Sequence, residues 1–144
     1  MGLSQQDALP LSEFVKRNYS RRVVEVGCGK RSRTAFVLTR SLDIIVTDIL
    51  ESEAVDGCIK PFYIKDDITS PDLSLYQNAQ LLYSIRPPLE IQHSILNVAR
   101  IVQADVLVKP LDDEIIDVLR TYLKNYKGIA FYYFQAECAQ SSRC

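Results

Sequence analysis

Hydrophobic residues in this chain fall into two kinds of run, which alternate from residue 10 to residue 134. Short β-branched runs that stop at glycine, proline or charged residues are typical of buried strands. Longer runs with apolar positions three and four residues apart are typical of amphipathic helices. The pattern predicts helices at 10–19, 32–42, 89–103 and 112–126, a short helix or turn at 49–58, and strands at 22–27, 43–49, 61–68, 79–88, 104–111 and 129–134.

Strands that alternate with helices predict parallel β-α-β units, with helices on both faces of the sheet. We therefore expect one α/β domain over residues 1–144, with frayed ends at 1–9 and 136–144. Its sheet should be doubly wound, mainly parallel and six-stranded, in the order 3-2-1-4-5-6, as in Rossmann folds. A helix before 129–134 predicts a parallel last strand. Ligands bind such sheets at the carboxyl ends of the first and fourth strands, where the winding direction reverses.

Composition narrows the class of protein. Hydrophobic residues make up 47% and charged residues 24%, an ordinary globular balance. A formal net charge of −1 argues against a generally basic nucleic-acid binder and leaves room for a local basic patch. Because no apolar run is long enough for a membrane span and the N-terminus lacks a signal-peptide pattern, we expect a soluble cytoplasmic protein without membrane association.

The metal-ligating residue types are sparse. The four cysteines contain no Cys-x-x-Cys pair, and there is one histidine. We therefore expect free thiols and no metal site.

A glycine-rich stretch, "VVEVGCGKRSR" at 23–33, lies where the predicted sheet should bind a ligand. Gly27 allows a sharp turn after the first strand, and Gly29 removes a side chain where a ligand could approach the backbone. The amides of the following helix point into the same region. The stretch is thus a candidate cofactor-binding loop, with Cys28 at its centre.

Acidic residues end the second and third predicted strands. Asp48 follows the glycines at roughly the 20-residue distance that is typical of a ribose-binding acid, and Ile49 comes next. Asp67 and Ile68 end the third strand, where they could offer an acceptor to an adenine amino group and an aliphatic contact to its ring.

With these motifs the chain resembles two groups of proteins. The Glu-x-Gly-x-Gly pattern at 25–29, the acid at 48 and Asp-Ile at 67–68 resemble class I S-adenosylmethionine-dependent methyltransferases. The stretches "VVEVGCG", "VTDI", "DDIT" and "YSIRPP" are similar to a small archaeal family of uncharacterised proteins with a methyltransferase-like Rossmann core. The resemblance implies a fold and S-adenosylmethionine as cofactor, but no established activity. The residues implied to hold the cofactor are Glu25, Gly27, Cys28, Gly29, Asp48, Ile49, Asp67 and Ile68.

Both fingerprints that fit the glycine stretch are incomplete. The third glycine of the methyltransferase pattern is replaced by Arg31, and that of the dinucleotide pattern by Ser32. Glu25 favours the methyltransferases, because dinucleotide folds usually have an apolar residue there. An NAD(P)- or nucleotide-binding module remains the alternative. The direction of the last strand distinguishes the methyltransferase fold from the dinucleotide-binding fold, because class I methyltransferases commonly end with an antiparallel strand inserted into the sheet.

The motif "YSIRPP" at 83–88 supplies the candidate catalytic residues Tyr83, Ser84 and Arg86. Methyltransferases that act on exocyclic or amide nitrogens often have Asp or Asn, two prolines and an aromatic residue at this position. The resemblance therefore concerns the place of the motif in the fold more than its residue types. Arg86 could bind a substrate carboxylate or phosphate through two parallel hydrogen bonds. Alternatively, it belongs to a rigid loop and pairs with Glu90 or Asp67.

Three cations, Lys30, Arg31 and Arg33, lie at the start of a predicted helix, where each opposes the helix dipole by up to about 1 kcal/mol. The negative charges of a pyrophosphate or a nucleic-acid backbone would offset this unfavourable interaction. Alternatively, the three cations are solvated surface side chains. Three functions stay open: an S-adenosylmethionine-binding protein with a small-molecule or RNA substrate, a nucleotide-binding module, or a non-enzymatic domain that binds RNA or protein. A homodimer through the C-terminal strand is also possible.

Overall fold

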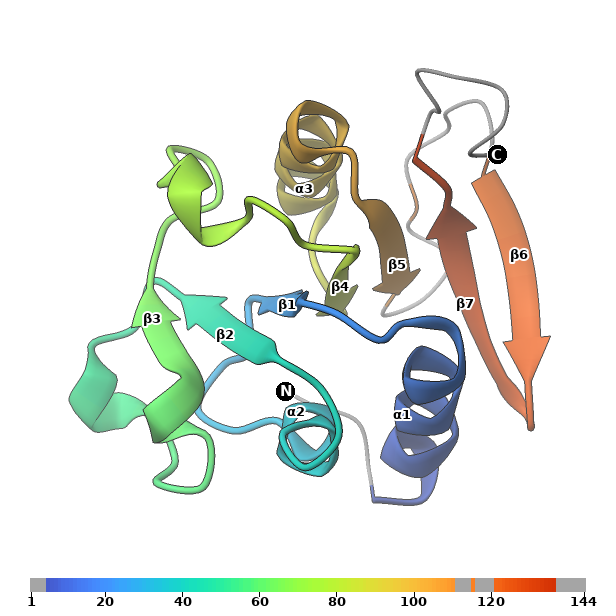
Figure 1. The fold of residues 1–144 in the computed structure, drawn as a ribbon, viewed down its shortest axis with the longest axis horizontal. Helices are drawn as coiled ribbons and strands as arrows, with labels where there is room; N and C mark the ends of the chain where they lie inside the picture. Colours follow the sequence, from blue (N-terminus) through green and yellow to red (C-terminus); the bar gives the residue numbers. More distant parts are fainter. Residues whose placement is uncertain (1–4, 111–114, 116–120, 137–144) are drawn as a thin grey trace.

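The computed structural model describes residues 5–110, 115 and 121–136. One sheet crosses the molecule in the order β3-β2-β1-β4-β5-β7-β6 (Figure 1). The strands are β1 (Val23–Val26), β2 (Ile44–Asp48), β3 (Tyr63–Lys65), β4 (Leu81–Ile85), β5 (Asp105–Lys109), β6 (Thr121–Tyr126) and β7 (Ile129–Phe134). The helices are α1 (Gln5–Asn18), α2 (Arg33–Leu38) and α3 (Leu89–Val102), with 3₁₀ turns η1 (Ser52–Ala54), η2 (Lys60–Phe62) and η3 (Leu73–Leu75).

The sheet is covered on both faces, as predicted. In Figure 1, α1 and α2 lie on one face and α3 on the other. Alternate residues of β1 point to opposite faces, because successive side chains of a strand do so. Val23 belongs to the core cluster under α1 and α2, and Val24 to the cluster under α3. The α/β Rossmann-like class is thus confirmed.

The C-terminal part of the prediction is wrong. Within the described residues the sheet has seven strands, and β7 is antiparallel to both β5 and β6. Residues 121–126, expected to be helical, form β6, while 111–114 and 116–120 lie outside the described residues. Lys127 and Gly128 connect β6 to β7 with φ of 51° and 89°. A two-residue connection with positive φ at both positions favours a tight hairpin, and this turn outweighs the helical spacing of the residues before it.

The strand at 129–134, which we expected at the edge of the sheet, lies inside it. Phe131 is fully buried, and its ring centroid lies 4.8 Å from that of Phe14 on α1. At the other end of the strand, Tyr133 donates to Asp105 Oδ2 at 3.0 Å. Because β7 is paired along both sides, its edge is not free for a dimer. The homodimer remains a prediction, and among the described strands β6 is the one with a free edge at this end of the sheet.

Several element boundaries differ from the prediction. Helix α1 begins at Gln5, so Pro10 lies within it rather than at its start. At the other end, Ala136 N–H donates to Asp105 Oδ1 at 2.8 Å, and 137–144 lie outside the described residues. The predicted helix 32–42 shortens to α2, with Ser32 as its N-cap, as expected.

The third predicted strand shortens because its end leaves the sheet. β3 stops at Lys65, although Asp66 N–H still donates to Asp48 O at 3.0 Å. Asp67 then turns the chain, since its Oδ1 accepts hydrogen bonds from the backbone N–H and hydroxyl of Thr69 at 2.9 and 2.6 Å.

Candidate functional site at the carboxyl end of the sheet

The glycine loop wraps over the end of β2. Gly27 and Cys28 both donate their N–H groups to Thr47 O, at 2.8 and 3.0 Å. Gly27 and Gly29 have φ of 73° and 66°, in the left-handed region that favours glycine. A Cβ at Gly29 would have no neighbour within 4 Å. Open space therefore adjoins the backbone at this glycine, as a binding loop requires.

Asp48 joins the second strand to this loop. Its Oδ2 accepts a hydrogen bond from Gly29 N–H at 2.8 Å, and its Oδ1 accepts one from Ile49 N–H at 2.7 Å and a longer one from Leu50 N–H at 3.3 Å. A carboxylate offers about four acceptor positions, so capacity remains on Oδ2 for one more donor. Beside it the apolar side chain of Ile49 is 64% exposed. The structure thus brings together Gly29, Asp48 and Ile49, as the sequence predicted.

Glu25 lies beneath the loop in a buried polar network. Its Oε1 accepts hydrogen bonds from Ser32 Oγ at 2.7 Å and from the Tyr83 hydroxyl at 2.5 Å. Burial, with a smaller contribution from the charge of Asp48, raises the pKa of Glu25 to about 7, although the two hydrogen bonds act in the opposite direction. Ser32 also accepts from Ala35 N–H at 3.0 Å, so the carboxyl group anchors the N-cap of α2.

Two of the three catalytic candidates are buried. Tyr83 donates to Glu25, and Ser84 Oγ donates to Val26 O at 2.7 Å. Their side chains are 0% and 1% exposed. Both hydroxyls are therefore used inside the protein, where they tie β4 to β1, and the interpretation of these residues as facing a substrate has no support in this geometry.

Arg86, the third candidate, lies on the surface just after β4. Its backbone has a φ of 59° and donates to Lys109 O at 2.6 Å. Its side chain is exposed and forms no ion pair with Glu90, Asp67 or any other described residue. A left-handed conformation costs a non-glycine residue about 1–2 kcal/mol. The strained arginine therefore holds its guanidinium at the carboxyl edge with no structural partner in the described chain.

Substitutions of Arg86 show whether its backbone strain or its side chain affects the stability of the fold. We expect Arg86→Gly to unfold at the same temperature as the wild type or higher, with up to about 1 kcal/mol of stabilisation, because glycine relieves the positive φ. Arg86→Ala keeps the strain and should not gain stability. Thermal unfolding followed by circular dichroism compares the three proteins. A marked loss of stability in the glycine variant would mean that the side chain supports the fold.

The two candidates after β3 differ in accessibility. Asp67 is exposed, and its hydrogen bonds from Thr69 lower the pKa of this carboxyl group. Ile68 is 6% exposed and belongs to the cluster under α3. The pair thus sits near the site, with Asp67 on the surface and Ile68 in the core.

Two supports of the site were missed by sequence reasoning. Asp66 accepts hydrogen bonds from the Tyr76 hydroxyl at 2.6 Å and from Asp72 N–H at 3.0 Å, which fixes the loop after β3. The Tyr63 hydroxyl donates to Asp48 O at 2.8 Å and to Leu50 O, so it holds the chain where the acid lies. No spacing rule in the sequence links these residues, because the partners meet only after β2 and β3 pair.

Cys28 fills space within the loop. The side chain is 3% exposed, and its Sγ lies 3.2 Å from Gly29 O. Burial, together with the negative charges of Glu25 and Asp48, raises the pKa of this thiol. A protonated, buried thiol is a poor nucleophile, so the cysteine acts as a small apolar residue here.

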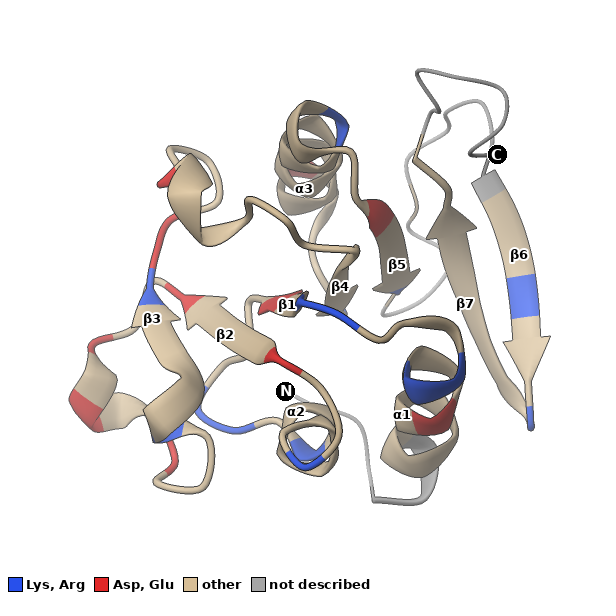
Figure 2. Ribbon diagram, viewed as in Figure 1, with Lys and Arg blue, Asp and Glu red and all other residues tan. Residues whose placement is uncertain are grey.

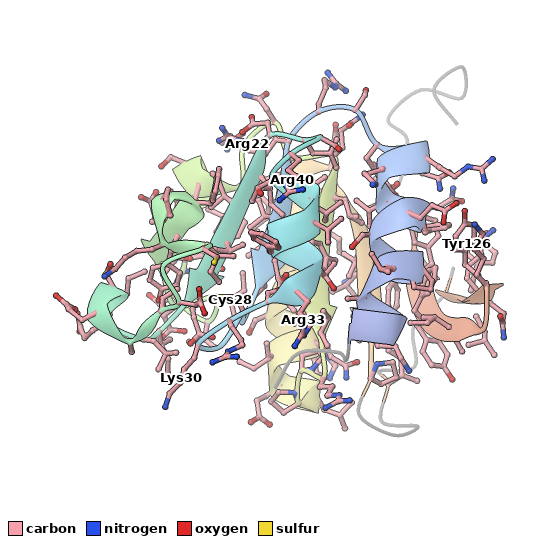
Figure 3. The ribbon with its side chains drawn as sticks, turned by 90° about the horizontal axis from the view of Figure 1, so that it is seen from below. Arg22, Cys28, Lys30, Arg33, Arg40 and Tyr126 are labelled. Atoms are coloured by element: carbon pink, nitrogen blue, oxygen red, sulfur yellow. The ribbon has the colours of Figure 1, made fainter. Side chains whose placement is uncertain are left out.

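Basic side chains lie beside the loop. Lys30, Arg31 and Arg33 are exposed. In Figure 3, Lys30 and Arg33 lie towards one end of the sheet, and Arg22 and Arg40 towards the other. The basic loop before α2 is also visible as a blue segment in Figure 2. The cations predicted from the sequence are therefore at the carboxyl edge, with the candidate cofactor-binding residues.

Metal-ligating clusters and membrane-spanning helices are both absent from the described part of the chain. Over residues 5–110, 115 and 121–136, no cluster of three or more His, Cys, Asp or Glu side chains could hold a metal ion. In the same part of the chain, no helix is long and apolar enough to cross a membrane.

Solved structures of methyltransferases share this fold. A TehB-like S-adenosylmethionine-dependent methyltransferase from Corynebacterium glutamicum superposes with a TM-score of 0.60 at 13% identity, over 91% of this chain and 87% of that protein. An RNA methyltransferase from Salinibacter ruber, solved with S-adenosylhomocysteine, gives 0.56 at 12% identity, over 95% and 94% of the two chains. At such low identity the likeness concerns the fold.

Sequence comparisons place the chain in a family. A protein from Archaeoglobus fulgidus is 40% identical over 130 residues, which span 90% of this chain and 95% of that protein. A protein from Methanocaldococcus jannaschii is 35% identical over 123 residues, or 85% and 89% of the two chains. Both carry the family name UPF0146, and the family pattern matches residues 9–136. The chain therefore belongs to UPF0146, described as an uncharacterised protein family.

Proposed function

We propose that this protein binds S-adenosylmethionine at the glycine loop and acts as the core of a methyltransferase. The observation that carries the proposal is the contact of Asp48 Oδ2 with Gly29 N–H at 2.8 Å, which sets a ribose-binding type of acid against a glycine turn. The antiparallel β7 between β5 and β6 supports the methyltransferase alternative, because the dinucleotide fold predicted a parallel last strand.

The residues present fit this cofactor. Asp48 Oδ2 retains an acceptor position for a ribose hydroxyl, and open space adjoins Gly29. The exposed side chain of Ile49 offers an apolar surface for a nucleobase. Asp67 lies at the surface after β3 and could accept from an amino group. Glu25 supports the loop from below through Ser32, rather than by facing the ligand.

The contribution of the chain is to bind and orient. The cofactor, when bound, supplies a methyl group activated by its sulfonium. Methyl transfer depends mainly on holding the acceptor in line with the reacting centre, so it does not require a strong general base in the protein. Arg86, at the end of β4, is the exposed polar candidate for holding the acceptor on the other side of the switch point.

A binding measurement with an Asp48 variant tests the proposal. We expect S-adenosylhomocysteine to bind the wild type in isothermal titration calorimetry and Asp48→Asn to bind about 10–100-fold more weakly, because hydrogen bonds to a charged group contribute about 1.5–3 kcal/mol. Asp43→Asn is the matched control. Asp43 is exposed at the other end of β2, where it pairs with Arg22 with N–O distances of 3.0 and 3.2 Å.

The outcomes separate the competing functions. Equal binding by both variants and the wild type would contradict the role of Asp48. Binding of NAD or ATP in place of S-adenosylhomocysteine would favour the nucleotide-binding alternative, and binding of none of the three would favour a non-enzymatic domain. Thermal unfolding of each variant shows whether a loss of affinity reflects a loss of fold.

A further inference from the structure

We propose that the carboxyl edge of the sheet beyond the glycine loop binds the phosphate groups of a single-stranded nucleic acid. This inference rests on the proposed function and names the substrate class of that site. It is carried by exposed or half-exposed cations that follow β1 and β4 or end β5, three neighbouring strands, and that form no ion pair with a described residue. These cations are Lys30, Arg33, Arg86 and Lys109.

The backbone places these cations side by side. β4 lies between β1 and β5 in the sheet. A Cβ at Gly27 would lie 3.9 Å from Ser84 Oγ, so the start of the glycine loop contacts the end of β4. Two residues later, Arg86 N–H donates to Lys109 O at 2.6 Å. The basic residues thus follow one edge from the loop after β1 to the end of β5.

Among the described residues, the acids that follow β2 and β3 lie on the other half of this edge and each accepts a hydrogen bond, while Glu90, exposed in the first turn of α3, lies on the basic half. Asp48 accepts from the glycine loop, Asp66 from the Tyr76 hydroxyl and Asp67 from Thr69. Figure 2 shows red segments at the end of β2 and in the loop after β3, and a blue segment in the loop before α2. The side proposed for the cofactor thus carries Asp48, Asp66 and Asp67, and the four cations lie beside it together with Glu90.

Some cations elsewhere in the described chain are paired, and others, such as Arg21 and Arg40, form no ion pair with a described residue, so the four cations are set apart by their position along one edge. Arg22 pairs with Asp43, Lys65 with Glu51 and Lys127 with Glu13. We leave Arg31 out of the set, because its charge helps to lower the pKa of Asp56 and it therefore has an acid nearby.

An extended polyanion suits this arrangement better than one small anion. From β1 to β5 the cations extend over two strand spacings, or about 10 Å. A chain of phosphates can contact several cations over that span, and each contact releases a condensed counterion. The arginines add bidentate geometry for phosphate oxygens. An exposed nucleobase beside such contacts would then lie next to the proposed cofactor site.

The test follows RNA binding as salt is varied. Fluorescence anisotropy of a labelled single-stranded RNA of about 12 nucleotides would be measured between about 50 and 200 mM salt. With four phosphate contacts, log K should fall with log salt at a slope of about −2.8. The double substitution Lys30→Glu and Arg33→Glu should halve this slope to about −1.4 and weaken binding at least about tenfold at low salt.

The control changes the same amount of charge at the other edge. Arg21 and Arg40 are exposed and lie on the amino-terminal side of the sheet, so Arg21→Glu with Arg40→Glu should leave RNA affinity within about twofold of the wild type. Equal losses of RNA affinity in the two double variants would overturn the proposal, since affinity would then depend on the net charge of the protein and not on the position of the cations. Absence of RNA binding by the wild type, or its displacement by inorganic phosphate at low millimolar concentration, would also overturn it.

Binding of S-adenosylhomocysteine, measured in parallel, distinguishes this inference from the proposed function. Retained affinity for that ligand in the Lys30→Glu, Arg33→Glu variant with lost RNA affinity supports the division of the edge into two halves. If the wild type binds S-adenosylhomocysteine but no RNA, the nucleic-acid surface alone is refuted. If it binds RNA through these cations but no S-adenosylhomocysteine, the cofactor proposal alone is refuted.

Discussion

Replacing Phe131 with alanine is expected to lower the free energy of unfolding by about 3–5 kcal/mol. The ring is fully buried in β7, and it packs edge-on against Phe14 of α1, with centroids 4.8 Å apart. Truncation leaves a cavity under α1, because a strand that is paired on both sides cannot move to fill it. Urea unfolding, followed by far-ultraviolet circular dichroism, measures the change.

An aromatic residue of the neighbouring strand provides the control for Phe131. Tyr122 lies on β6 with 48% of its surface exposed, and Tyr122→Ala should cost less than about 1 kcal/mol. A small loss for Phe131→Ala, comparable to that for Tyr122→Ala, would contradict the interior position of β7. The pair of variants therefore tests the antiparallel hairpin on which the comparison with methyltransferases depends.

Replacing Glu25 with glutamine is expected to stabilise the protein above pH 7 by about 3 kcal/mol. The pKa of this carboxyl group rises from its ordinary value of 4.5 to about 7 in the folded protein. Between these two values the folded state binds more protons than the unfolded state, so the stability of the wild type falls as pH rises through this window. Each pH unit corresponds to about 1.4 kcal/mol.

The measured quantity is the difference in unfolding free energy between Glu25→Gln and the wild type, determined from pH 4 to pH 8. It should be small near pH 4, where Glu25 is protonated in both states, and grow towards neutral pH. Glu53→Gln is the control, because Glu53 is exposed on η1 and its substitution should shift the profile little. A difference that stays constant with pH would show that Glu25 does not titrate with a raised pKa.

The buried carboxyl group has a consequence for the proposed site. Glu25 reaches the glycine loop through Ser32, which caps α2, and its charge is felt by Cys28 within the loop. Deprotonation near neutral pH therefore places a negative charge beneath the loop that Asp48 contacts. Affinity for S-adenosylhomocysteine that follows pH in the wild type but not in Glu25→Gln would link the two carboxyl groups.

Local signals predicted the part of the site that is built from consecutive residues. The glycines at 27 and 29 require positive φ, and the acid at 48 ends a β-branched strand, so both could be read without coordinates. Because the strands from β3 to β5 are parallel, their carboxyl ends lie at one edge of the sheet, and the glycines and Asp48 meet there. By contrast, whether Tyr83 and Ser84 face solvent depended on which neighbours cover β4, and the sequence pattern alone could not decide it.

The sequence by itself determined the α/β class, the glycine loop, the acid opposite it and the position of the cations, because each follows from backbone preference or from spacing along the chain. The tertiary structure alone decided the hairpin of β6 and β7 and the burial of Glu25, Tyr83 and Ser84. These features depend on residues far apart in the chain, such as Phe14 and Phe131 or Glu25 and Tyr83. Long-range pairing can override a local helical pattern, since residues 121–126 form β6 by pairing along β7 although most of their side chains are exposed.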